Sequence, residues 1–316
     1  GPAPPPRPGR RRGRRAGGGD VRASRRAAQA VVAAAVLFST GGAAIKATDL
    51  SGLQVACLRS GVAAVALLAM LPGTRRRWSW RVVLVGAAFA VTLILFVQAN
   101  KLTTAANSIF LQSTSPLYLV LLGPLLLREP VRRGDLAFMA VLGAGMSLFF
   151  VASEAPGDTA TNPAAGNAMA LASGVGWALT VAGLRWLARS DEPDAAARAT
   201  VAGNAIAFVA CLPAVAASPA VGVRDAMVVT YLGVVQIGLA YVFLTAAVRR
   251  VGALEASLLL FVEPALSPVW AWLVTGETPS PLALTGGAII IGATLVRTVR
   301  HTRGHPRPRP AAPARE

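Results

Sequence analysis

The stretch EPALSPVWAWLVTGE, Glu263–Glu277, decides how the rest of the sequence is divided. It is apolar enough to lie within a membrane, yet it begins with a carboxylate beside a proline and ends with a second carboxylate. A shift of 148 residues aligns it with SPLYLVLLGPLLLRE, Ser115–Glu129, so that the first proline and the last glutamate of the two copies coincide. Alanine and leucine match often by chance in an apolar sequence, whereas a proline and a glutamate in the same register indicate an internal duplication.

The composition of the whole chain is that of a membrane protein. Of its 316 residues, 54% are hydrophobic and only 14% are charged, with a mean hydropathy of +0.56. Soluble domains are about 25% charged. A membrane-spanning helix needs about 20 mostly apolar residues. Ten runs of the chain reach that length, and they are 27–46, 52–72, 82–99, 104–127, 135–152, 164–187, 197–217, 226–247, 253–275 and 281–298.

The distribution of Lys and Arg agrees with this division, because loops on the cytoplasmic side of a membrane carry an excess of both residues. Of the 31 Lys and Arg residues, 27 fall in alternate segments that begin with the N-terminal tail. The intervening segments contain only Lys46, Lys101 and Arg224, and Arg59 lies within the second run. We therefore expect an all-α protein with ten transmembrane helices and both termini in the cytoplasm, in the plasma (inner) membrane.

Ten helices and one duplication predict two repeats of five helices each. Because five is odd, the second repeat must enter the membrane in the opposite orientation, which makes the repeats inverted. The predicted organisation is a disordered basic cytoplasmic tail (1–26), a first repeat (27–152), an extracytoplasmic linker (153–163), a second repeat (164–299) and a second disordered basic cytoplasmic tail (300–316). Inverted repeats with a binding site between them, near the middle of the bilayer, are typical of secondary transporters.

The duplicated motif also resembles a known family. TTAANSIFLQSTSPLYLVLLGPLLLRE (103–129) and GALEASLLLFVEPALSPVWAWLVTGE (252–277) are similar to the paired motif of EamA-type members of the drug/metabolite transporter superfamily, and CLRSGVAAVALLAM (57–70) is similar to the second span of that family. The resemblance covers residues 27 to 299. It implies ten helices in two EamA repeats and the movement of a small metabolite, commonly outward.

Glu263 is the first candidate for a functional side chain. A carboxylate in the middle of the bilayer costs about 2.5–3.5 kcal/mol on insertion scales, so it should face protein or a watery cavity. It could bind the amine of a substrate or carry a proton as the coupling ion, or it could satisfy the backbone next to Pro264. The remaining substrate-binding candidates are polar or aromatic side chains of other helices, namely Gln98, Gln112, Ser113, Ser115, Trp177, Gln236 and Tyr241.

Four further residues are candidates for a hinge or a gate. Pro116 and Pro264 each remove a backbone donor and tend to bend a helix, which would give a pore wall a place to flex. Glu129 and Glu277 end the two copies of the motif, where they could form loop contacts, ion pairs or gate latches. Arg59, a few residues from the outer end of its helix, is interpreted as an interfacial anchor.

These patterns favour a secondary active transporter for a small amphipathic solute, either neutral or zwitterionic, such as an amino acid. The resemblance alone implies that the direction of transport is export. A passive facilitator or channel-like uniporter on the same scaffold is the alternative. No enzyme, cofactor, metal site or nucleic-acid partner is expected, because the apolar body contains no histidine and no close pair of acids. The partners are the lipid bilayer, the solute and, from the small residues of 140–145 and 286–295, a second copy in a homodimer.

Overall fold

The computed structural model describes residues 1, 16–122, 133–151, 157, 159–190, 192–217, 221–248, 251, 256 and 259–303. These ranges are helical apart from turns and one isolated bridge between Gly157 and Ala160. Parts of the predicted linker and of the two predicted tails lie outside the described residues. Glu129, one of the predicted gate residues, also lies outside them.

Helical structure is present in all ten predicted segments. The first half contains α1 (Ala16–Ser39), α2 (Gly41–Lys46), α3 (Gly52–Met70), the short η1 (Pro72–Arg75), α4 (Trp80–Leu102), α5 (Ala105–Gln112), α6 (Ser115–Leu122) and α7 (Arg133–Val151). The second half contains α8 (Pro163–Ala188), α9 (Ala195–Ala216), α10 (Val223–Tyr231), η3 (Leu232–Leu239), α11 (Ala240–Val248), α13 (Val262–Thr275) and α14 (Pro281–Arg303).

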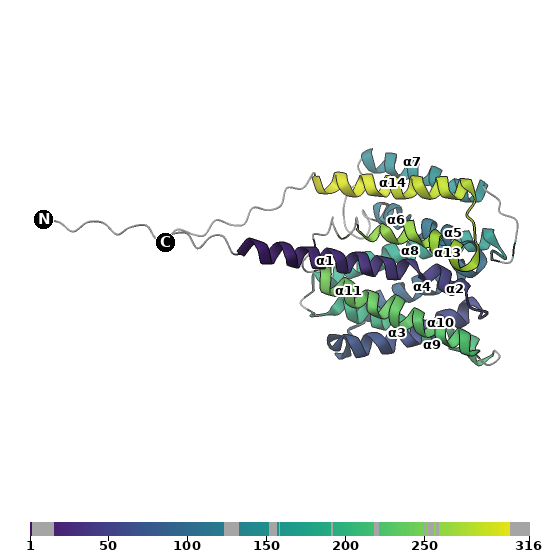
Figure 1. The fold of residues 1–316 in the computed structure, drawn as a ribbon, viewed down its shortest axis with the longest axis horizontal. Helices are drawn as coiled ribbons and strands as arrows, with labels where there is room; N and C mark the ends of the chain where they lie inside the picture. The colour runs from purple at the N-terminus through teal and green to yellow at the C-terminus, as the bar shows by residue number, and fades with distance from the viewer. Residues whose placement is uncertain are drawn as a thin grey trace.

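Seven helical segments of the described chain are long and apolar enough to cross a membrane, so the chain is an integral membrane protein. Figure 1 shows α1 beginning and α14 ending at the same end of the bundle, which we call the terminal end. The connection between α13 and α14 lies at the opposite end, which we call the far end (Figure 1).

Side chains at the helix starts explain several of these boundaries. Ser51 caps α3, where its hydroxyl accepts from the Gln54 backbone N–H at 3.3 Å and the Gln54 side chain accepts from the Ser51 N–H at 2.8 Å. Thr104 caps α5 in the same way, and Asn162 caps α8 with a proline at its first position. Such caps satisfy backbone donors that would otherwise be buried without a partner.

One interruption of the helices follows the shift of 148 residues found in the sequence. The break between α5 and α6 occupies Ser113 and Thr114, and the turn at Phe261 that precedes α13 lies 148 residues after Ser113. The two copies of the duplicated motif therefore have a helix break at the same position.

Corresponding helices of the two halves pack against one another in antiparallel fashion. In α7 and α14, Asp135 pairs with Arg297 at 2.7 Å, while Gly286 lies against Gly145 and Phe149. In α3 and α9, the Cys57 thiol donates to the Phe208 carbonyl. Nearly three turns further along α3, Leu67 joins a cluster with Val201 of α9. Equivalent helices that run in opposite directions are what a pair of inverted repeats requires.

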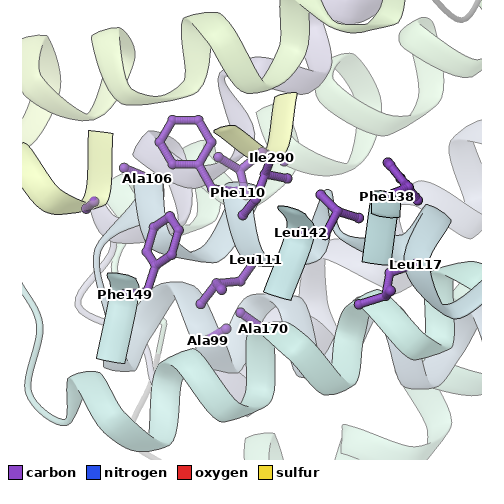
Figure 2. Close-up of a cluster of buried hydrophobic side chains, with 12 residues drawn as sticks. Ala99, Ala106, Phe110, Leu111, Leu117, Phe138, Leu142, Phe149, Ala170 and Ile290 are labelled. Carbon is purple, nitrogen blue, oxygen red and sulfur yellow. The ribbon is translucent and has the colours of Figure 1, made fainter. Parts of the chain in front are cut away.

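A cluster of buried apolar side chains joins α5 to α7, α8 and α14. Figure 2 shows Phe110 and Leu111 of α5 among Leu142 and Phe149 of α7 and Ile290 of α14. The α7–α14 backbones approach so closely that a Cβ on Gly286 would lie 2.7 Å from the Gly145 carbonyl oxygen. Gly145 and Gly286, two of the small residues from which a homodimer was predicted, thus pack against each other within one chain.

The structure corrects three details of the predicted organisation. Helix α1 begins at Ala16 and α14 continues to Arg303, so parts of both predicted disordered tails are helical. Extending an existing helix costs far less than starting one, since each added residue also adds a hydrogen bond. Pro116 and Pro264 lie in the first turns of α6 and α13, where a missing N–H costs little, so the helices are interrupted before these prolines and not bent at them.

Candidate functional site

A cavity of about 280 Å³ lies between the two halves of the bundle. Both chain interruptions line it, through Ser113 in the first half and Phe261 in the second. The rest of its wall comes from α1, α3, α4, α5, α6, α8, η3, α11, α13 and α14. Helix breaks inside a membrane protein are tolerated where they are buried in protein or line a cavity, and both of these breaks line one.

The structure brings together seven of the eight predicted substrate-binding residues in this cavity. These are Gln112, Ser113, Ser115, Trp177, Gln236, Tyr241 and Glu263. Gln98 is the exception, because its side chain packs against Gly52 at the start of α3. Of the predicted hinge and gate residues, Pro116 and Pro264 also line the cavity, whereas Glu277 lies at the far end of the bundle.

Aromatic rings form a continuous wall along part of the cavity. The Tyr241 ring contacts Phe38 at a centroid distance of 5.4 Å and Phe89 at 6.3 Å, both edge to face. Phe89 in turn contacts Trp177 at 6.1 Å. Such rings offer a large apolar surface with fixed geometry, which suits the apolar part of a small solute.

The amide side chains on the wall are held in place by neighbouring helices. Gln112 donates to the Ser173 hydroxyl at 2.7 Å, and that hydroxyl donates to the Thr92 carbonyl at 3.1 Å. Gln236 donates to the Phe38 carbonyl at 3.3 Å, while its own amide oxygen is buried without a hydrogen-bond partner. Gln236 therefore retains an acceptor that a solute in the cavity could use.

Gln236 lies in η3, a π-helical segment between α10 and α11 that the sequence did not predict. π-helical turns are rare, and they occur often at functional sites. The segment changes the rotation of the chain at the point where Gln236 and Ile237 reach the cavity. A regular helix of the same sequence would direct this pair differently.

Arg59 of α3 is a cavity residue that the sequence reasoning missed. The sequence led us to interpret Arg59 as an interfacial anchor, but the residue is only 2% exposed and lines the cavity. A charged side chain within a membrane helix costs at least about 2.5–3.5 kcal/mol and usually marks a functional site. That cost was the available signal, since Arg59 lies two helical turns inside the start of α3 and not at its edge.

Glu263, in the first turn of α13, also lines the cavity and is half-buried. The wall thus contains one carboxylate and one guanidinium, together with several hydroxyl and amide groups. Within the described residues, no group of three His, Cys, Asp or Glu side chains is placed to hold a metal ion. The arrangement is suited to binding a small solute.

A buried polar layer closes the far end of the bundle above this cavity. Lys46 at the end of α2 and Glu277 after α13 form an ion pair at 3.3 Å. The second oxygen of Glu277 accepts from the Ala105 N–H at 2.8 Å, at the first residue of α5, and Lys46 also donates to the Thr159 carbonyl. Four separate parts of the chain are joined by these contacts.

Comparisons with known proteins agree with this architecture. The EamA-like transporter family model matches residues 25–151 and again 164–298. An uncharacterized transporter of Bacillus subtilis (strain 168), YdfC, is 41% identical over 64 residues, which are 20% of this chain and 21% of that protein, so the match spans about a fifth of the relative.

One solved structure, a crystal structure of a protein, has a TM-score of 0.58 and 22% identity over 89% of this chain and 99% of that one, a likeness of fold alone. The two family matches coincide with the two halves of the bundle and leave only the linker between them. With most of its length matched in this way, the chain belongs to the EamA-like transporter family.

Proposed function

We propose that this membrane transporter is a secondary active transporter that moves a small amino acid-like or other amphipathic metabolite by alternating access. In this proposal the chain forms ten transmembrane helices in two inverted repeats, with both termini in the cytoplasm and the protein in the plasma membrane. Export is the proposed direction, and a proton carried by Glu263 is the proposed coupling ion. Glu263 also binds the solute, together with the remaining site residues.

The observation that carries the proposal is the position of the cavity. It lies between two halves of the bundle that are each interrupted at the cavity wall, and in which α3 runs antiparallel to α9 and α7 antiparallel to α14. Because the two halves share one sequence pattern, each can adopt the conformation of the other, and the exchange would move the opening of the cavity from one side of the membrane to the other.

The far-end polar layer supports a gate on that side. Its ion pair between Lys46 and Glu277 is almost completely buried, with side chains 4% and 3% exposed. A transporter that alternates must break such contacts in one half of its cycle and restore them in the other. We propose that Lys46 and Glu277 form the extracytoplasmic gate, with Glu129, outside the described residues, as its counterpart on the cytoplasmic side.

The proposal is tested by exchange in proteoliposomes. Vesicles with the purified protein are loaded with a metabolite extract, and mass spectrometry records which solutes leave, compared with protein-free vesicles. The proposal expects saturable efflux, acceleration by the same solute on the opposite side, and accumulation against a gradient when a pH difference is imposed. Saturable exchange without accumulation would indicate the passive facilitator, and efflux that never saturates would indicate a pore.

A further inference from the structure

The cavity contains two opposite charges that do not neutralise one another. Arg59 of α3 and Glu263 of α13 both line it, yet they form no ion pair, although three other ion pairs are present in the described part of the chain. In a medium of low dielectric constant, opposite charges attract strongly and usually meet unless something else satisfies them. The absence of an ion pair between these two cavity residues therefore calls for an explanation.

The guanidinium of Arg59 has no partner among the residues that the structure describes. The residue is 2% exposed, its Nε has no hydrogen-bond acceptor, and no acceptor among the described residues binds its other nitrogens. A planar guanidinium matches the geometry of a carboxylate, which it binds through two parallel hydrogen bonds. A buried arginine that faces a cavity without a partner is thus prepared for an anionic group that comes from outside the protein.

Glu263 offers the complementary charge on the wall of the same cavity. No described residue donates a hydrogen bond to its carboxylate or forms an ion pair with it. Tyr241 also lines the cavity, and its ring packs on Phe38 and Phe89. The cavity therefore combines two charges with an aromatic surface, and a solute in contact with both charges would lay its apolar part on those rings.

We infer that the substrate is a zwitterion whose anionic group binds Arg59, whose cationic group binds Glu263, and whose apolar body lies against the aromatic wall. The inference rests on the proposed function, which it deepens by naming the charge pattern of the substrate and assigning Arg59 to it. A solute with only one charge would leave the other charge of the cavity buried without a partner. Selection against such solutes follows from that cost.

The test uses two sets of probes that keep the body constant and change only the charges. One set is phenylalanine, phenethylamine, 3-phenylpropionate and 3-phenylpropanamide. The other is leucine, isoamylamine, 4-methylpentanoate and 4-methylpentanamide. The full-length protein in lipid nanodiscs is heated with each probe, and the shift of the unfolding temperature is recorded. We expect stabilisation by the zwitterion of at least one set and little by its singly charged or neutral analogues.

Variants then assign the charges. Arg59→Gln should weaken zwitterion binding about 10- to 100-fold, because charge-assisted hydrogen bonds are lost. The affinity for the zwitterion should then equal the affinity for its amine analogue. Arg59→Lys keeps the charge and should retain most of the selectivity. Arg198→Gln is the matched control. Arg198 is also a buried arginine, but it does not line the cavity and it forms an ion pair with Glu192 at 2.9 Å. Its loss should therefore leave the preference among the probes unchanged.

Three results would overturn the inference: no zwitterion stabilises the protein, a singly charged or neutral analogue stabilises it as well, or Arg59→Gln preserves the preference for the zwitterion. Failure of the transport proposal looks different. Exchange of a solute with a single charge in proteoliposomes would support the transport proposal and contradict the assignment of a zwitterionic substrate. Zwitterion binding that depends on Arg59, without any exchange in proteoliposomes, would support the zwitterion assignment and contradict the transport proposal.

Discussion

Lys46 and Glu277 form a buried ion pair at 3.3 Å that joins α2 to the turn after α13 at the far end of the bundle. The same glutamate accepts from the first N–H of α5 at 2.8 Å, where the positive end of the helix dipole favours a carboxylate. The pair therefore connects the first helical segment of one repeat to the end of the motif in the other. This relationship is the basis of the proposed gate.

We expect removal of one member of this pair to destabilise the protein. Lys46→Met or Glu277→Gln leaves the other group buried without its partner, which costs about 3–5 kcal/mol in comparable sites. Lys46→Met combined with Glu277→Gln should cost less than the sum of the single changes. Thermal unfolding in nanodiscs measures all three, and strictly additive losses would show that the two side chains are not coupled.

Loss of the pair should also open the far end. In a background with Cys57 and Cys211 replaced by Ala, Ser113→Cys places a thiol on the cavity wall. A membrane-impermeant thiol reagent added from the extracytoplasmic side should label it several-fold faster when Glu277→Gln is also present. Equal labelling rates with and without Glu277→Gln would mean that the pair does not close this end.

Glu263→Gln tests the proposed coupling to protons. The variant cannot bind or release a proton and has no charge for the cationic group of a solute, so exchange of solute for solute should weaken about 10- to 100-fold, and accumulation driven by a pH difference should be lost. Both are measured in proteoliposomes over a range of pH. Transport with unchanged rate and unchanged pH dependence would exclude Glu263 as the proton carrier.

The close contact of α7 with α14 predicts a position-dependent effect of adding one methyl group. Gly286→Ala brings a Cβ to 2.7 Å from the Gly145 carbonyl oxygen and the Phe149 ring, so it should destabilise the protein by about 1–3 kcal/mol. Gly143→Ala, in the same helix pair but with open space around it, should be neutral or slightly stabilising. Unfolding temperatures of the two variants check this, and equal shifts would contradict the packing.

Much of the fold is predictable from the sequence because bilayer thickness sets helix length and the excess of Lys and Arg marks one side. The cavity residues follow less directly. Ser113 and Ser115 could be selected because they are polar residues in an apolar segment, and Ser115 aligns with Glu263 in the duplicated motif. Arg59 was misjudged because hydropathy along the chain gives the depth of a residue but not the direction in which its helix turns it. The π-helical turn at Gln236 has no local sequence signal that we can identify.

The proposal of alternating access is tested most directly by closing the far end reversibly. With Lys46→Cys and Glu277→Cys in the background without native cysteines, a reducible bifunctional thiol reagent joins the two positions in protein reconstituted into proteoliposomes, and solute exchange is measured before and after reduction. The account predicts that exchange stops in the cross-linked protein and returns on reduction, while variants with only one of the two cysteines are unaffected. Exchange at an undiminished rate in the cross-linked protein would contradict it.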